Sequence, residues 1–300
     1  MLRKVQKLEL LVLVLCLLGC AQNNEPAGST ISPFDKYWQD NGAEITSFEL
    51  KQARYGEMRE GTAVLVFVTE PFSKKKQVKL DHWKRAGKDR IDVPKMNMTK
   101  NFITGIYPYS MMMSTFTPVG NRPALKVTTS SQEWCGHTFM QLNKQDSAAY
   151  SLTSHSYFES EGDRIEPIYA DYLEDQVWTT IRLDPDNLPR GQFKMLPASF
   201  YMRLKHRPVE AIAVTGTLIK KSNTRSTTGP HSTYSLVYAD RTISIHFEES
   251  EPYCILGWEE TYSDGVETLT TVATRIQTIR SEYWQRNSNE DVTLRKKLGL

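Results

Sequence analysis

Short segments in which apolar and polar residues alternate recur along most of this chain, and they limit its possible folds more than any other feature. Residues 242–247 and 234–238 each place large apolar side chains at every second position, which is typical of half-buried β-strands. Ala239–Arg241 is a suitable hairpin connection between these two strands. The unbroken apolar run Ala63–Val68 has the length of a strand and predicts one that is buried on both faces.

Further segments follow the period-two pattern, and turn-forming residues separate them. Leu269–Thr278 is rich in Thr, Val and Ile and favours a strand, although helical spacing from Val272 to Tyr283 leaves a helical ending open. The other segments of this kind are Val177–Leu183, Phe200–Leu204 and Ile212–Val214. The strands do not alternate with long helices, which argues against Rossmann and TIM-barrel architectures. The sequence therefore predicts an all-β fold with minor α content, built on a large antiparallel meandering sheet that is curved or barrel-like.

Two breaks in this pattern bear on domain organisation. Ser32-Pro33-Phe34-Asp35 carries the N-cap, N1 and N3 signals of a helix start, so we expect a short helix through Trp38. The Pro-rich stretch 184–197 is where the β-rich body, residues 32–300, could divide into two β halves.

The first twenty residues have the anatomy of an export signal. Arg3, Lys4 and Lys7 form a positive start, and the apolar run Leu10–Leu18 is too short to span a bilayer. Small residues follow at the position where a signal peptidase cleaves. We therefore expect residues 1–19 to be removed as a signal peptide.

The tetrapeptide Leu17-Leu18-Gly19-Cys20 resembles the lipobox of bacterial lipoproteins. The resemblance implies that a diacylglyceryl group is attached to Cys20 and that the new amine is acylated, with chains such as palmitate. Each buried methylene contributes about 0.8 kcal/mol, so three acyl chains would hold the protein on a membrane permanently. An ordinary signal peptide in which Cys20 is incidental is the alternative. Residues 20–31 are polar and contain Pro and Gly, so we expect a lipidated N-terminus and flexible tether with an r.m.s. reach of about 17–20 Å.

The charge balance limits the partners of the mature chain. The sequence has 37 Lys and Arg against 35 Asp and Glu, and removal of residues 1–19 leaves 34 of each. A net charge of zero argues against nucleic acid as a partner and against attraction to a membrane surface by charge. With 39% hydrophobic residues, the mature chain can build one large β domain or two smaller ones. The lipid would then be the only membrane anchor.

Gln132–His137 is the one dense cluster of chemically active residues. Cys135 and His137 would face the same side of a strand beside Glu133, where they could act as nucleophile and base or as metal ligands. Their separation along a strand is about 7 Å, too long for a direct hydrogen bond unless Gly136 marks a bulge. We therefore favour a core strand in which Gly136 permits close packing and Cys135 is buried or bridged.

The chain lacks the common catalytic and cofactor motifs, including phosphate-binding Gly loops, His-Glu-x-x-His and Cys-x-x-Cys. We expect no cofactor and no metal. The paired carboxylates in Glu248–Glu251 and Glu259–Glu260 are expected to lie in solvated loops. After export and lipidation, Cys135 and Cys254 remain; they either form a disulfide or stay as two buried free thiols.

A methionine-rich segment is the candidate for an apolar site. On a strand, Met111 and Met113 share one face, and Tyr107 and Tyr109 flank them. Met adapts to varied apolar partners, so these four side chains could line a cavity for a lipid-like ligand. Ordinary core filling is the alternative.

Three segments, Glu44–Tyr109, Gln132–His137 and Ser154–Phe158, resemble a set of uncharacterised lipoproteins of Bacteroidota. Some members carry the label "septum formation inhibitor Maf", but true Maf proteins are cytoplasmic α/β nucleotide pyrophosphatases with a Ser-x-Arg-Arg motif that this chain lacks. The resemblance therefore implies no established mechanism. Tyr234–Trp284 is also faintly similar to envelope proteins built on an open, curved sheet, such as the lipoprotein carriers of the outer membrane.

These observations favour a membrane-anchored, non-enzymatic lipoprotein of the cell envelope that binds an apolar ligand or an envelope partner on a curved β-sheet. The alternatives are a thiol-dependent hydrolase or transferase that uses Cys135 and His137, and an envelope scaffold without a ligand pocket. Ala21-Gln22 follows Cys20, so Asp is absent from the second position, and only Glu25 is acidic nearby. By resemblance to other lipoproteins, this predicts the outer membrane, with the protein facing the periplasm.

Overall fold

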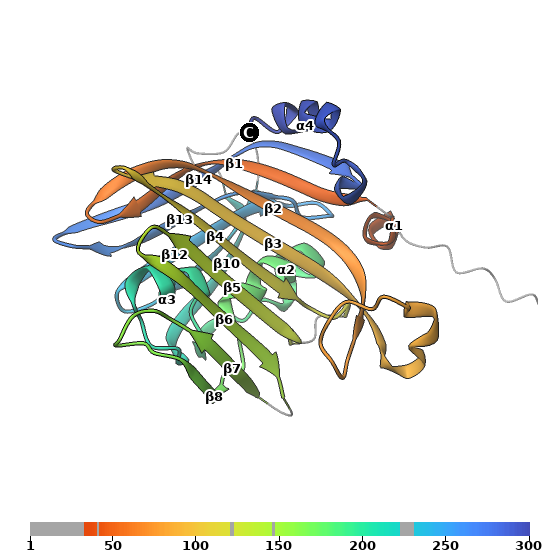
Figure 1. Ribbon diagram of the computed structural model, residues 1–300, viewed down its shortest axis with the longest axis horizontal. Helices are drawn as coiled ribbons and strands as arrows, with labels where there is room; N and C mark the ends of the chain where they lie inside the picture. Colours follow the sequence, from red (N-terminus) through yellow and green to blue (C-terminus); the bar gives the residue numbers. More distant parts are fainter. Residues whose placement is uncertain (1–32, 41, 121–122, 146–147, 223–230) are drawn as a thin grey trace, which may run out of the picture. The chain divides into compact units, whose positions relative to one another are not determined.

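The computed structural model describes residues 33–40, 42–120, 123–145, 148–222 and 231–300 (Figure 1). Residues 33–300 form one compact unit. Its fourteen strands make a single antiparallel sheet, which confirms the predicted all-β fold with minor helix. The first arm of the sheet consists of β1 (Ala43–Arg54), β2 (Glu57–Ser73), β3 (Arg90–Thr104), β4 (Tyr107–Phe116), β5 (Lys126–Glu133), β6 (Gly136–Lys144), β7 (Ala149–His155) and β8 (Arg164–Tyr169). The second arm consists of β9 (Gly191–Met195), β10 (Ile212–Ser222), β11 (His231–Val237), β12 (Arg241–Glu248), β13 (Ile255–Asp264) and β14 (Glu267–Ser281).

The chain enters this sheet at its centre. The first arm runs outward from β1 to β8 at one edge, and the second arm starts with β9 at the other edge and returns to β14 beside β1. β1 and β14 pair from Ala43 opposite Ser281 to Lys51 opposite Val272. The Pro-rich stretch 184–197 contains β9 and therefore lies at the start of the second arm, so the two halves belong to one sheet. The edges β8 and β9 have only six and five residues, which limits pairing with other chains, and the sheet stays open.

Two of the helices lie between the two arms. The helices are α1 (Pro33–Gln39), α2 (Glu174–Leu183), α3 (Ser199–Lys205) and α4 (Val292–Lys297). α2 contacts β3 and β4, and α3 contacts β4 and β5 (Figure 1). On the opposite side, Trp178 of α2 and Tyr201 of α3 make edge-on ring contacts with Trp258 and Tyr262 of β13, at centroid distances of 5.2 and 5.7 Å. The concave side of the sheet is therefore filled by helices.

The strands predicted at Val177–Leu183 and Phe200–Leu204 are wrong, because these residues form α2 and α3. A helix on a protein surface reveals itself by an apolar stripe with a period of 3.6 residues. α2 is enclosed by the sheet, and eight of its ten residues are buried, including the polar ones. Without a solvent-facing side, the stripe is lost and the helical period cannot be recognised.

Three other predictions of local structure agree with the structure. The short N-terminal helix is α1, and Leu269–Thr278 lies within β14. Ala63–Val68 lies within β2 and is covered on both faces: Leu65 packs in the main core, whereas Val64 and Val66 pack on the outer face near Leu298.

Candidate functional site

The predicted thiol cluster lies at an exposed hairpin turn and not in a core strand. Cys135 lies between β5 and β6, and both it and His137 are exposed. Glu133 Oε2 accepts a hydrogen bond from the Cys135 backbone N at 2.6 Å. A side-chain hydrogen bond with Glu133 raises the pKa of the Cys135 thiol. A raised thiol pKa is the opposite of what a cysteine nucleophile requires.

Close packing at Gly136 is the part of that prediction which the structure confirms. A β-carbon at Gly136 would overlap the ring of Tyr157, from the β7–β8 connection. The Tyr157 hydroxyl donates a hydrogen bond to Glu133 Oε1 at 3.3 Å. The glycine thus allows an aromatic ring to lie directly on the hairpin.

The alternative of a disulfide between Cys135 and Cys254 is wrong, because both are free thiols in the structure. Cys254 precedes β13 and is half-buried, with its Sγ 3.7 Å from Glu44 Oε2 and 3.8 Å from Arg182 Nη2. Burial is the main cause that raises the pKa of Cys254 to about 12. The prediction of two buried free thiols is also wrong for Cys135, which is exposed.

The four residues proposed to line an apolar cavity belong to the core. Met111, Met113 and Tyr109 are 1–3% exposed, and Tyr107 is half-buried against them. Tyr109 stacks on Phe102 at a centroid distance of 4.9 Å. The predicted alternation along β4 is correct, but Tyr109, Met111 and Met113 are enclosed by their neighbours and offer no open surface to a ligand.

A buried ion-pair network holds the start of α2 against the second arm. Arg241 of β12 donates two hydrogen bonds to Glu174, both at 2.6 Å, and one to Glu260 of β13 at 2.7 Å. Lys100 Nζ lies 3.9 Å from Glu260 Oε2. Because each buried carboxylate faces a buried cation, the charges compensate within the core. The prediction that Glu259 and Glu260 lie in a solvated loop is wrong, because both belong to β13, whereas residues 249–251 do form the loop that follows β12.

A second buried ion pair holds the end of α2 against the first arm. Arg182 pairs with both carboxylate oxygens of Glu44 in β1 and donates a hydrogen bond to the Pro252 carbonyl oxygen at 2.8 Å. Tyr37 of α1 donates a hydrogen bond to the same carboxylate. Ion pairs thus hold both ends of α2 in the concave interior of the sheet.

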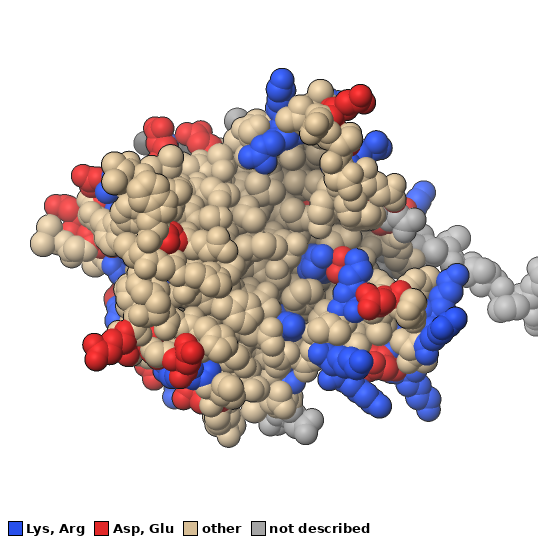
Figure 2. Space-filling view, in the orientation of Figure 1, with Lys and Arg blue, Asp and Glu red and all other residues tan. Residues whose placement is uncertain are grey.

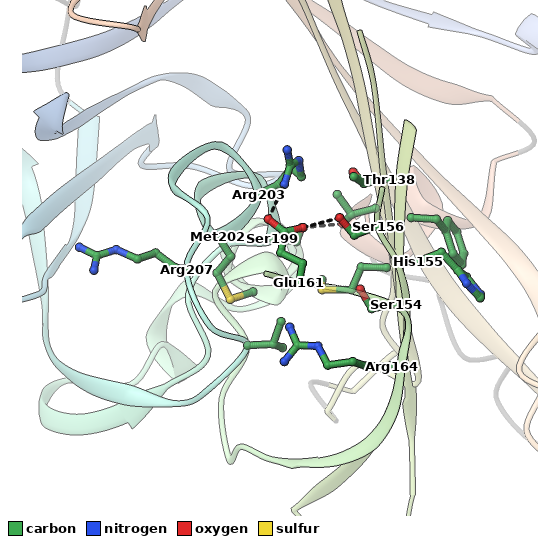
Figure 3. A pocket seen from close by; sticks show the side chains of 14 residues that line it. Thr138, Ser154, His155, Ser156, Glu161, Arg164, Ser199, Met202, Arg203 and Arg207 are labelled. Atoms are coloured by element: carbon green, nitrogen blue, oxygen red, sulfur yellow. Dashed lines mark hydrogen bonds and ion pairs between the residues drawn. The ribbon is translucent and has the colours of Figure 1, made fainter. Parts of the chain in front are cut away.

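A small polar pocket lies between α3 and strands β5 to β7 (Figure 3). Glu161 accepts hydrogen bonds from Ser156 Oγ at 2.6 Å and Arg203 Nη1 at 2.8 Å, and His206 Nδ1 lies 2.7 Å away. Burial alone would raise the pKa of Glu161, but these hydrogen bonds and the Arg203 charge lower it below its usual range. The cavity volume of about 50 Å³ has room for one or two water molecules, and not for a lipid.

A much larger groove, of about 850 Å³, lies where α1 meets the β2–β3 region. Three indole and aliphatic side chains on its wall come from distant parts of the chain: Trp38 from α1, Leu183 from α2 and Trp284 from the segment after β14. The apolar wall also includes Val68, Ile91 and Val119. Binding pockets for small molecules typically have volumes of 300–1,000 Å³, so this groove is large enough for a ligand.

Charged groups form one side of this groove. Glu70 accepts hydrogen bonds from Lys79 at 3.0 Å and Lys95 at 2.8 Å, and Arg90 pairs with Asp92 at 3.0 Å. Burial would raise the pKa of Glu70, but the two lysines outweigh this effect and lower it. The groove therefore joins an apolar wall to a polar rim that can hydrogen-bond a headgroup.

Sequence reasoning missed this groove because its wall is assembled from residues 38, 183 and 284. The available signal was local charge, since Lys and Arg are dense between residues 74 and 90. Figure 2 shows Lys and Arg gathered at the end of the body that holds the β2–β3 loop, next to the groove.

Within the described ranges, no group of three or more His, Cys, Asp and Glu side chains is placed to hold a metal ion. No helix among those residues is both long and apolar enough to cross a membrane.

Comparisons with known proteins give a structural similarity and no family. No protein-family model matches the chain, and no curated protein matches it. Among solved structures, the chain is similar to a β-barrel-like protein of the domain of unknown function DUF1849 from Brucella abortus, with 8% identity and a TM-score of 0.49. The similarity covers 80% of this chain and 98% of that one. A similarity at this level assigns no function.

Proposed function

We propose that this protein is a membrane-anchored, non-enzymatic lipoprotein of the cell envelope, and that it binds an amphipathic ligand in the groove beside α1. The observation that carries the proposal is the 850 Å³ groove with an apolar wall and a charged rim, at the end of the body where the chain continues from residue 33. The export signal and Leu17–Cys20 support the anchor.

The groove is a better ligand site than the concave side of the sheet. The concave side is occupied by α2 and α3, whose buried residues pack against both arms. In the groove, the 44% exposed Trp284 and the half-buried Leu183 offer the apolar surface that an acyl chain or similar group would cover, whereas Trp38 beside them is 8% exposed. Lys79 and Arg90 on the rim can donate hydrogen bonds to an acidic or zwitterionic headgroup.

Native mass spectrometry of the full-length mature protein, extracted from its own membranes, tests ligand binding. Trp284→Ala removes an indole from the groove wall and should lower ligand occupancy about tenfold, as expected for an aromatic anchor. Trp134→Ala is the matched control, because it removes an equally large, 69% exposed indole from the β5–β6 turn. A ligand-free wild-type protein, or equal loss of ligand in both variants, would refute the groove as the site.

The anchor and its location need a separate test. Cys20→Ala should move the protein from the membrane fraction to the soluble periplasmic fraction. We further propose the periplasmic face of the outer membrane, so added protease should cut the body only in lysed cells. Digestion in intact cells would instead place the body on the cell surface.

A scaffold without a ligand is the second candidate, because both ends of α2 are fixed by ion pairs inside a filled core. A ligand-free protein that is crosslinked in cells to one abundant envelope protein would favour this candidate. A thiol-dependent hydrolase is less favoured, since the pKa of Cys135 is raised by Glu133.

A further inference from the structure

The connection between β2 and β3 is strongly basic. Residues 74–90 contain eight Lys and Arg and two Asp, which gives this segment a formal charge of plus six. We call this segment the basic loop. Seven of its cationic side chains are exposed: Lys74, Lys75, Lys76, Lys79, Lys84, Arg85 and Lys88. The net charge of the whole protein therefore conceals a dense local charge.

The basic loop has a defined structure. Asp89 accepts hydrogen bonds from Ser73 Oγ at 2.6 Å and from the Lys75 backbone N at 2.9 Å, and these bonds lower its pKa. The Lys74 backbone N donates to the Asp89 carbonyl oxygen at 2.9 Å, which closes the base of the loop. Trp83 is 42% exposed beside Arg90 and Lys84, whose charged groups lie 4.5 and 5.4 Å from its ring. The loop thus presents cations and an indole together on an ordered backbone.

The basic loop lies at one end of the long central strands, and the β1–β2 turn lies at the other. The basic loop shares the groove with the end of α1, so it lies at the end of the body where the described chain begins. β2 has seventeen residues and spans about 55 Å, so the β1–β2 turn lies at the far end. Figure 2 shows Asp and Glu side chains at the end of the body opposite the basic loop. Glu57 and Glu60 of the β1–β2 hairpin and Glu267 of the neighbouring β13–β14 hairpin are exposed.

We propose that the basic loop rests on the surface of an anionic phospholipid bilayer and orients the body with its groove toward the membrane. This inference depends on the membrane anchorage proposed above, and it adds the surface that the body presents to the lipid. Clusters of four to eight Lys and Arg next to a membrane attachment point bind acidic lipid headgroups. Trp83 adds a side chain of the type that concentrates at membrane interfaces.

A weak electrostatic attraction between the basic loop and the bilayer is sufficient to orient the body, because the proposed lipid anchor already holds the protein at the membrane. In the proposed lipoprotein, only the twelve residues 21–32 separate the anchor at Cys20 from the start of α1. Contact between the loop and the bilayer is then an intramolecular event with a high effective concentration. At the far end, Glu57 pairs with Arg59 and Asp264 pairs with Lys205, so charges there largely compensate and the bilayer attracts mainly the end that holds the basic loop.

Hydrogen exchange on the full-length lipoprotein tests the proposal. The protein, purified from membranes, is reconstituted into vesicles of phosphatidylcholine alone and of phosphatidylcholine with phosphatidylglycerol. Amides of residues 75–88 should exchange several-fold more slowly on the anionic vesicles, whereas residues 264–267 at the far end should not change. The slowing should disappear at 1 M salt, where the Debye length is about 3 Å.

A charge-neutralised variant and a matched control identify the contact. Replacing Lys75, Arg85 and Lys88 with Gln should lower the docked-to-free ratio about a hundredfold and abolish the slowing. Replacing three exposed cations outside the loop, Lys51, Lys194 and Arg207, with Gln should leave it intact.

Three outcomes would overturn the proposal: equal exchange on both kinds of vesicle, equal effects of the two variants, or slowing by a soluble polyanion but not by vesicles. Failure of the anchor is a different result. An unlipidated protein would not associate with phosphatidylcholine vesicles, but sedimentation with phosphatidylglycerol vesicles would still report docking of the loop.

Discussion

Arg241→Met should destabilise the protein more than any exposed substitution, because it leaves two buried carboxylates without their main partner. The Arg241 side chain is 1% exposed, and those of Glu174 and Glu260 are 0% and 7% exposed. After the substitution, Glu174 keeps a hydrogen bond from Tyr238 at 2.7 Å, and Glu260 keeps only Lys100 at 3.9 Å. Breaking a buried ion pair by removing one partner costs about 3–5 kcal/mol.

Urea unfolding followed by tryptophan fluorescence measures this loss, since Trp178 and Trp258 meet in the core at 5.2 Å. For a domain of this size, the same loss corresponds to a decrease in Tm of about 6–20 °C. Arg207→Met is the control, because Arg207 pairs with Asp240 on the surface and should change the free energy of unfolding by less than about 1 kcal/mol.

A second variant identifies the cause. Glu174→Gln combined with Arg241→Met removes one uncompensated charge while Glu260 keeps Lys100, so it should recover most of the stability lost in the single variant. If Arg241→Met unfolds within about 1 kcal/mol of the wild type, the reasoning about buried charge is refuted.

Three further predictions follow from individual sites. Gly136→Ala should lower the free energy of unfolding in urea by about 1–3 kcal/mol, because the new β-carbon would overlap the Tyr157 ring. Adding Tyr157→Ala should restore part of that stability, and an equal loss in the single and double variants would contradict this account. Burial raises the pKa of Asp175 to about 7, so the folded protein holds this proton more tightly than the unfolded chain, and stability should fall as pH rises from about 4 to 7. In Asp175→Asn, the urea midpoint should depend less on pH over that interval. An unchanged pH dependence of the midpoint would show that another group is responsible. Iodoacetamide, with labelling followed by mass spectrometry, should modify Cys135 no faster in the native than in the denatured protein, because Glu133 raises the pKa of the thiol. Glu133→Gln should accelerate labelling of the native protein. Faster labelling of the native wild type than of the denatured protein would show that Cys135 is an activated thiol.

The strands could be predicted because most of them have one face in the core and one toward solvent. Residues 242–247 show this clearly, since Ile243 and Ile245 are buried while Thr242 and Ser244 are half-exposed. α2 could not be predicted in the same way. Its environment is protein on nearly all sides, so Glu174 and Arg182 are buried next to Val177 and no periodic contrast remains.

The candidate groove lay beyond sequence reasoning for a different reason. Trp38, Leu183 and Trp284 come together only because the chain starts and ends its sheet at the centre. The basic loop was visible in the sequence, but a charge summed over the whole mature chain cancels it against acidic residues that lie elsewhere on the body. Local charge is informative only when the fold shows which segments lie at the same end.

The pairing of β1 with β14 has a consequence for how the chain reaches this fold. Thr46 and Thr278 bond across the centre of the sheet although they are 232 positions apart. Contacts between residues so far apart in the sequence form slowly, because a long loop must close before the contacts contribute any stability. Until β14 has been synthesised, β1 has an unpaired edge in the middle of the future sheet. A nascent chain of this topology therefore cannot close the centre of its sheet until its last strand has been synthesised.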